Sequence, residues 1–119
     1  MKIESKTFHS KWFEFPDSAG ASVLIKEVPT HRVHSMLQGA ISFGSKNDVA
    51  AKSDFLVELT KSAIVSWSNI EDEDGKSLEV NDDNKERLIE HEGMYVFLQN
   101  CMFEVSREAE ESREKKRKN

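Results

Sequence analysis

The segment KWFEFPDSAGASVLIKEV, residues 11–28, contains two short apolar runs separated by a cluster of turn-forming residues. The first run ends at Phe15, and the second is rich in β-branched residues between Val23 and Val28. Because Pro, Asp, Ser and Gly favour turns between strands, the segment predicts a β-hairpin with a loop of about five residues. An isolated hairpin is only marginally stable in water, so its apolar face must pack on helices or on another chain.

Downstream of the hairpin, apolar residues recur at intervals of three, four and seven, which is typical of amphipathic helices. The pattern predicts a helix from Thr30 to Gly44, a central helix over residues 48–66, a short helix that starts at Asn81 or Asp82, and a last helix from Met94. The predicted fold is therefore α+β and mainly α-helical, with an N-terminal β-hairpin packed on three to four helices. Residues 1–105 are expected to form one globular domain, and residues 106–119 a charged, helical or frayed tail.

The composition excludes several classes of protein. The chain has 119 residues, a net charge of −5 and a single cysteine, Cys101. One cysteine forms no internal disulfide and supplies no structural zinc site by itself. No apolar run approaches the roughly 20 residues of a membrane helix, and residues 1–6 lack the apolar stretch of a signal peptide. We therefore expect a cytoplasmic protein with no membrane partner.

The acidic segment EDEDG, residues 71–75, has the composition of a calcium loop but not its register. With Gly75 at position six of an EF-hand loop, Ile70 takes position one and Asn81 takes position twelve, where carboxylates are required. Residues 71–83 contain seven acidic residues and one basic residue, so weak cation binding remains an alternative. A solvated acidic turn is the favoured interpretation, and no metal site or cofactor is predicted.

Other candidate reactive residues lack the partners that catalysis needs. His31 and His34 lie three residues apart, but no Cys or carboxylate follows them at ligand spacing. His91 is not followed by a second histidine four residues later, because that position is Tyr95. Cys101 falls on the apolar stripe of the last helix, where a small buried side chain is expected. The sequence predicts no catalytic residue and hence no enzyme.

The C-terminal segment is basic. Its candidate contact residues for an acidic partner are Arg113, Lys115, Lys116, Arg117 and Lys118. Basic residues also suit the negative end of a helix dipole, which needs no partner. The spacing of Glu110 from Arg113 and of Glu111 from Lys115 favours ion pairs along an exposed helix. Because the whole chain is acidic, nucleic acid is not expected as a partner.

The stretch IVSWSNIEDEDGKSLEVNDDN, residues 64–84, resembles the tail assembly chaperones of long-tailed phages and prophages. In that family a helix that ends in Trp precedes a turn of the form V/I-x-D-E-D-G-x-P-L, and a P-E-N-x-x-x-L-L helix and an aromatic-rich helix follow. The matching positions are Trp67, Asp72-Glu73-Asp74-Gly75, Leu78, Asn84, Leu88 and Phe97-Leu98. Ser77 stands where the family has Pro, and Asp82-Asp83 replaces Pro-Glu.

The resemblance implies a non-enzymatic chaperone that binds the tape measure protein, the tail tube protein or both while the phage tail assembles in the bacterial cytoplasm. The expected partner-binding residues surround the Trp67 end of the central helix: Trp67, Ile70, Asp72, Asp74, Leu78, Val80 and Leu88. The aromatic residues exceed what a small core requires, so we also expect a homo-oligomer. The alternative from another class is a small homo-oligomeric adaptor or regulator whose basic tail contacts nucleic acid.

Overall fold

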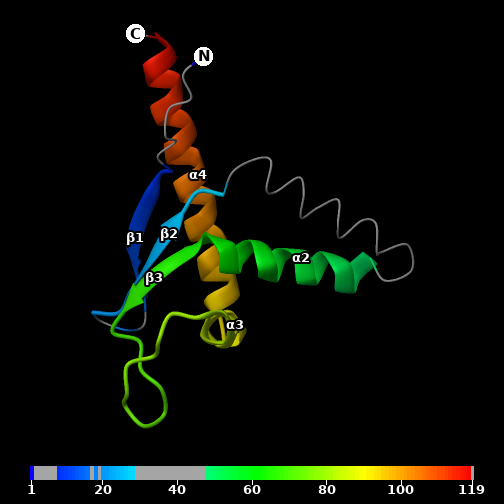
Figure 1. Cartoon of the computed structure of the whole chain (residues 1–119), viewed down its shortest axis with the longest axis vertical. Helices are drawn as coiled ribbons and strands as arrows, with labels where there is room; N and C mark the ends of the chain where they lie inside the picture. Colours follow the sequence, from blue (N-terminus) through cyan, green and yellow to red (C-terminus); the bar gives the residue numbers. More distant parts are fainter. Residues whose placement is uncertain (2–7, 17, 19, 29–47, 119) are drawn as a thin grey trace.

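A computed structural model describes residues 1, 8–16, 18, 20–28 and 48–118 of the chain. Figure 1 shows a small antiparallel sheet beside one long helix, with a second helix projecting from the sheet and a third lying below it. This arrangement confirms the predicted α+β class. The predicted helix from Thr30 to Gly44, with His31 and His34, lies outside the described residues.

The predicted hairpin is formed by strands β1 (Ser10–Glu14) and β2 (Ser22–Lys26), which pair antiparallel with Phe13 opposite Val23. The turn is closed by a 3.0 Å hydrogen bond from the Phe15 amide to the Ala21 carbonyl. Side chains alternate between the two faces of the sheet, as strand geometry requires. Val23 and Ile25 point to the inner face and are fully buried.

The prediction of one helix over residues 48–66 is wrong at its C-terminal end. Helix α2 (Asp48–Ala63) stops at Ala63, and strand β3 (Ile64–Ser68) begins at the next residue. β3 pairs antiparallel with β2, with Trp67 opposite Val23, so the sheet has the order β1-β2-β3. The edge of β2 provides a partner for Ile64, which lies opposite Ile25, and Val65 lies at a register shift between Ile64 and Ser66. Both β-branched residues suit a strand better than a helix. Tertiary pairing therefore overrides the helical periodicity of this segment.

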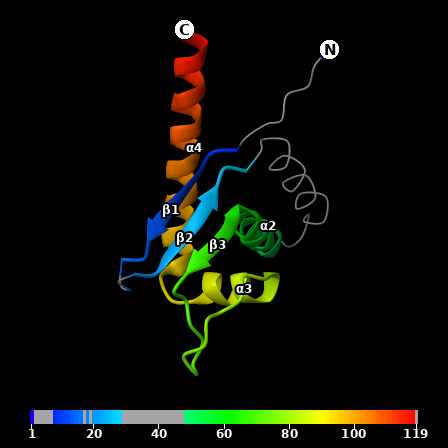
Figure 2. The ribbon, with the colours of Figure 1, turned by 60° about the vertical axis from the view of Figure 1, so that its left-hand side comes forward.

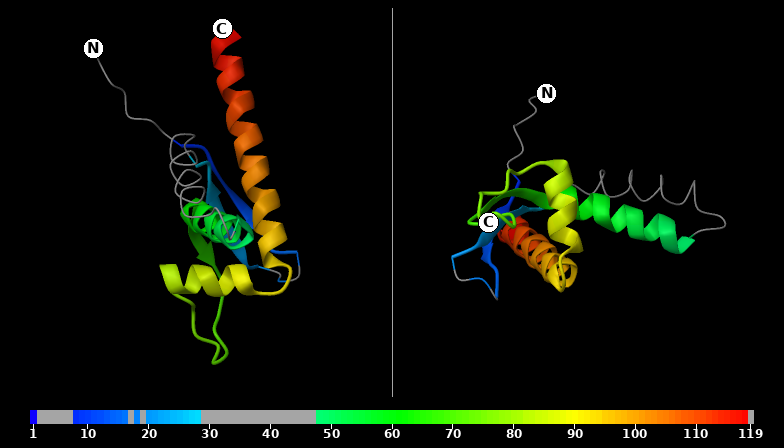
Figure 3. Two further views of the ribbon diagram at one scale, coloured as in Figure 1. Left: turned by 90° about the vertical axis from the view of Figure 1, so that its right-hand side faces the viewer. Right: turned by 90° about the horizontal axis from the view of Figure 1, so that it is seen from below.

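Helix α3 (Asp82–Glu90) begins as predicted, because the Asn81 side chain caps it by accepting a 2.8 Å hydrogen bond from the Asn84 amide. Gly93, with φ +75°, then turns the chain between α3 and helix α4 (Met94–Lys118), which runs crosswise to α3 (Figure 3). α4 lies along the inner face of the sheet and rises beyond it (Figure 2). Figure 3 shows α3 crossing below both the sheet and α2.

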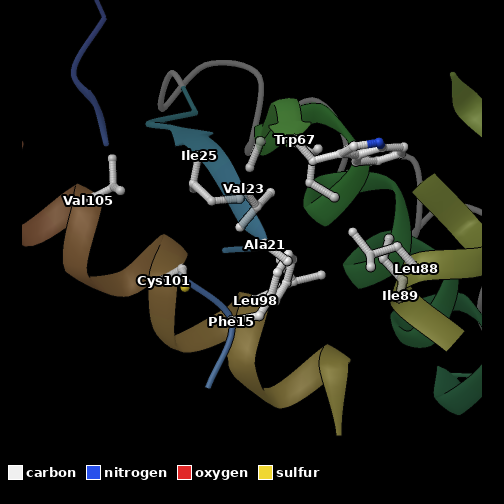
Figure 4. Close-up of a cluster of buried hydrophobic side chains, with 12 residues drawn as sticks. Phe15, Ala21, Val23, Ile25, Trp67, Leu88, Ile89, Leu98, Cys101 and Val105 are labelled. Atoms are coloured by element: carbon white, nitrogen blue, oxygen red, sulfur yellow. The ribbon is translucent and has the colours of Figure 1, made fainter. Parts of the chain in front are cut away.

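The core fills the space between the sheet, α3 and α4 (Figure 4). From α4 it receives one stripe of side chains at helical spacing: Leu98, Cys101, Val105 and Ala109. The contacts of α4 with the hairpin continue beyond residue 105. Glu108 bonds to Lys11 at 2.9 Å and Arg113 to Glu27 at 2.6 Å, so the first part of the predicted tail packs on the sheet.

Candidate partner-binding groove

Trp67 joins the sheet to the acidic turn. Its side chain is only 8% exposed, and its indole Nε1–H donates a 2.8 Å hydrogen bond to the Leu78 carbonyl oxygen. The bond satisfies the polar atom of a buried aromatic ring and holds the far side of the turn against β3. Trp67 therefore positions the predicted partner-binding segment, and it offers little surface of its own to a partner.

The acidic turn is a small hairpin built around Asp72. The Asp72 Oδ1 atom accepts hydrogen bonds from the amides of Asp74 at 2.9 Å and Lys76 at 3.0 Å. Backbone bonds continue the hairpin, and Leu78 donates to the Ile70 carbonyl oxygen at 2.8 Å. The Asp72 carboxylate thus shapes the turn, while Asp74 is exposed. Among the described residues, no group of three or more His, Cys, Asp or Glu side chains is arranged to hold a metal ion.

An open groove of about 330 Å³ lies between this hairpin, the turn of the N-terminal hairpin and the start of α4. Its apolar lining consists of Phe15, Ala21, Ile70, Leu78, Leu88 and Met94. Polar groups of Arg87 and His91 flank it on one side, with Glu71 and Asn69 among the other lining residues. A smaller hollow of about 120 Å³ shares Phe15 and Met94 with the groove and reaches Phe97. An apolar lining with a few polar groups is typical of a binding site.

The groove contains three of the seven predicted partner-binding residues, namely Ile70, Leu78 and Leu88. Val80 is half-buried against the core instead, and Trp67, Asp72 and Asp74 support or extend the turn. Sequence reasoning missed Phe15, Ala21 and Met94. Phe15 and Ala21 flank the first turn, far from the resemblance motif in sequence, and only the pairing of β2 with β3 brings the two turns together. The apolar residues at the two ends of the first loop were the signal in the sequence that could have indicated their place in the groove.

The basic residues of the C-terminal segment form other ion pairs than the predicted ones. Arg113 Nη2 bonds to Glu27 Oε1 on the sheet, and Arg107 pairs with Glu111 at 2.9 Å. Lys115 and Lys116 are exposed. For Arg117 and Lys118 the structure describes the backbone alone. Arg113 therefore fastens α4 to the hairpin, so it is already engaged within the chain.

Two ion clusters hold the helices in place, one between α2 and α3 and one between α4 and the N-terminal hairpin. Lys61, at the end of α2, is buried and contacts Asp82 at 2.9 Å, Glu58 at 3.2 Å and Glu86 at 3.4 Å. The hydrogen bond to Asp82 is the main cause that raises the pKa of Lys61 above its usual value. On β1, the hydrogen bond from Lys11 is the main cause that lowers the pKa of Glu108, and a bond to His9 contributes. The raised pKa of Lys61 and the lowered pKa of Glu108 both favour the charged forms of these two groups.

Cys101 is the one thiol of the chain, and its side chain points from α4 into the core. Burial raises the pKa of its thiol to about 12. Since the thiolate is the reactive form, Cys101 is a packing residue at neutral pH.

No protein-family model, curated protein or solved structure matches the chain. In the part of the chain that the structure describes, no helix has the length and apolarity needed to cross a membrane. The resemblance to tail assembly chaperones thus stays a prediction carried by the sequence motif in residues 64–90.

Proposed function

We propose that the protein is a non-enzymatic chaperone of phage or prophage tail assembly in the bacterial cytoplasm. It binds an apolar segment of the tape measure protein, the tail tube protein or both. The observation that carries the proposal is the open apolar groove, because Ile70, Leu78 and Leu88 of the resemblance motif line it together. Three apolar residues of the motif thus meet in one groove, which supports a shared role in binding.

The groove suits reversible capture of apolar side chains. A side chain of leucine size gains about 1.5–3 kcal/mol when it leaves water for such a site, which is enough for weak binding and not for permanent association. Arg87, His91 and Glu71 beside the groove can hydrogen-bond to the backbone of the bound segment. The exposed acidic residues of the turn would keep the complex soluble.

The test is co-expression with the tape measure protein from the same phage or prophage, followed by pull-down. We expect the chain to retain that protein in the soluble fraction. The variant Leu78→Gln should reduce retention by about tenfold, because it places a polar side chain in the groove and leaves the backbone carbonyl that Trp67 needs. Val65→Gln is the matched control, since Val65 is an exposed apolar residue of β3 that does not line the groove.

Retention that Leu78→Gln does not weaken, in a variant with unchanged thermal unfolding, would exclude the groove as the binding site. No retention by the folded wild-type chain would contradict the chaperone proposal. Salt-sensitive DNA binding that disappears when residues 114–119 are removed would instead support the adaptor alternative.

A further inference from the structure

The groove is lined by two residues of opposite charge that come from different elements. Glu71 belongs to the acidic hairpin after β3, and Arg87 belongs to α3 (Figure 1). Within the part of the chain that the structure describes, neither residue forms an ion pair with the other or with a third charged group. Both charges are therefore available to a ligand in the groove.

Arg87 has more hydrogen-bond donors than its contacts with the described residues use. Its Nη1 atom donates one bond of 3.2 Å to the neutral side chain of Asn84. A guanidinium has five N–H donors, and two parallel donors match the two oxygens of a carboxylate. A backbone carbonyl of a bound segment would need only one of them. Arg87 is therefore better suited to a carboxylate side chain than to a peptide group alone.

The hairpin side and the α3 side of the groove differ in charge. The hairpin over residues 70–80 contains five acidic residues and one basic residue, so the hairpin side is negative. The acidic residues of α3 do not line the groove, and two of them, Asp82 and Glu86, contact Lys61 of α2 instead. Arg87 is thus the charged residue that α3 contributes to the lining.

We propose that the groove selects a partner segment whose apolar residues are flanked by a basic residue on one side and an acidic residue on the other. The inference rests on the proposed function and names the class of segment that is bound. The apolar side chains contact Leu78 and Leu88, the basic residue lies beside Glu71, and the acidic residue pairs with Arg87.

Charge complementarity favours this segment over one that carries a single sign of charge. A segment with two basic residues would bring one of them to Arg87, and a segment with two acidic residues would bring one of them to the hairpin. Like charges in contact disfavour a partner. Because salt screens exposed charges over about 8 Å at physiological ionic strength, contacts in the groove outweigh the charge of the whole chain.

The test is the binding of synthetic peptides to the isotope-labelled full chain, followed by amide chemical shifts. All peptides have blocked ends and the core Leu-Phe-Leu, which is flanked by Lys and Glu in either order, by two Lys, by two Glu or by two Ser. We expect the tighter of the two mixed peptides to bind about threefold more tightly than each peptide with two like charges, since exposed ion pairs contribute little. Shifts at Leu78, Leu88 and Met94 identify the groove as the site.

Reversal of either charge in the groove should change this preference. With Arg87→Glu, the peptide with two Lys should bind most tightly, and with Glu71→Lys the mixed peptide should lose its advantage over the peptide with two Glu. Both residues are exposed, so the variants should keep the circular dichroism spectrum of the wild type. The matched controls are Lys115→Glu and Glu110→Lys, which make the same changes of charge on α4, outside the groove, and should leave the preference unchanged.

Two results would overturn the inference: a peptide with two like charges that binds the wild type as tightly as the mixed peptides, or a preference that Arg87→Glu leaves unchanged. Neither result contradicts the chaperone proposal if the peptide with two Ser still binds and Leu78→Gln weakens it, because the apolar lining then binds by itself. Failure of every peptide to bind would overturn the inference and also exclude the groove, and co-expression with the tape measure protein would then decide the chaperone function.

Discussion

Trp67 shows how one side chain can shape a groove without lining it. Its ring packs in the core, and its Nε1–H holds the Leu78 carbonyl, which fixes one wall of the groove. The apolar stretch from Ala63 to Trp67 predicts a buried end, and Trp67 is buried. The sequence could not predict that Trp67 lies in a strand opposite Val23, because that pairing is not local.

Replacing Trp67 should therefore affect stability before it affects binding. We expect Trp67→Ala to lower the free energy of unfolding by about 3–5 kcal/mol, because it leaves a cavity in the core. Trp67→Phe keeps most of the ring volume and loses the hydrogen bond, at a cost of about 1 kcal/mol. Urea denaturation followed by circular dichroism measures both. Equal losses for the two variants would show that packing of the ring contributes nothing beyond the hydrogen bond.

The lowered pKa of Glu108 predicts an acid-sensitive contact between β1 and α4. The folded-state pKa lies below the unfolded value of about 4.3, so the stabilisation is complete above that value and is lost as the pH falls through the folded-state pKa. Between about pH 5 and pH 2 the melting temperature of the wild type should thus fall more steeply than that of Glu108→Gln. The control is Glu114→Gln, which removes the same charge at an exposed position. Parallel pH profiles for the wild type and Glu108→Gln would contradict the role of this contact.

At the scale of the elements, the sequence predicts correctly those turns and helix ends that depend on neighbouring residues. The hairpin turn, the cap at Asn81 and the break at Gly93 are fixed by residues within a few positions. The boundary between α2 and β3 is not local. The position of this boundary depends on the free edge of β2, which is about 40 residues away in sequence. The hydrophobic periodicity of a segment does not show whether such a distant strand will pair with it.

The joint between α2 and α3 depends on the stem of Lys61 as well as on its charge. Lys61 reaches the surface through the core, and the Lys85 ammonium donates a 3.2 Å hydrogen bond to its backbone carbonyl. Its three carboxylate partners are largely exposed and stay hydrated when the ammonium is removed. We therefore expect Lys61→Met to cost no more than about 1 kcal/mol, and Lys61→Ala to cost more because the stem is lost.

Chemical denaturation of the two Lys61 variants tests this difference. The stability of Lys61→Met should also depend less on salt concentration than that of the wild type. A larger loss for Lys61→Met than for Lys61→Ala would indicate that the charge cluster, and not the packed stem, joins the two helices.

At the scale of the whole molecule, the end of the packed structure lies nearer to residue 113 than to residue 105. Glu108, Ala109 and Arg113 contact the sheet or the core, whereas Glu114, Lys115 and Lys116 are exposed. A chain of residues 1–113 should unfold within about 0.5 kcal/mol of the full chain, because Glu114, Lys115 and Lys116 are exposed. A chain of residues 1–105 loses both ion pairs and should melt at a clearly lower temperature.

Differential scanning calorimetry of the two shortened chains provides the comparison. It must be made at a protein concentration where both are monomeric, because association raises apparent stability. Equal melting temperatures would place the end of the packed structure at residue 105, where the sequence suggested it.

The contact between β1 and α4 also constrains how the protein is made. Lys11 and Glu108 are 97 positions apart, so the hairpin leaves the ribosome long before the helix that covers it has been synthesised. Until then the inner face of Val23 and Ile25 remains open to water or to other chains, and the hairpin alone is marginally stable. Folding of the hairpin must therefore wait until α4 has been synthesised. The unfinished chain thus exposes apolar surface to other chains. The proposed function is to cover such surface on a partner protein.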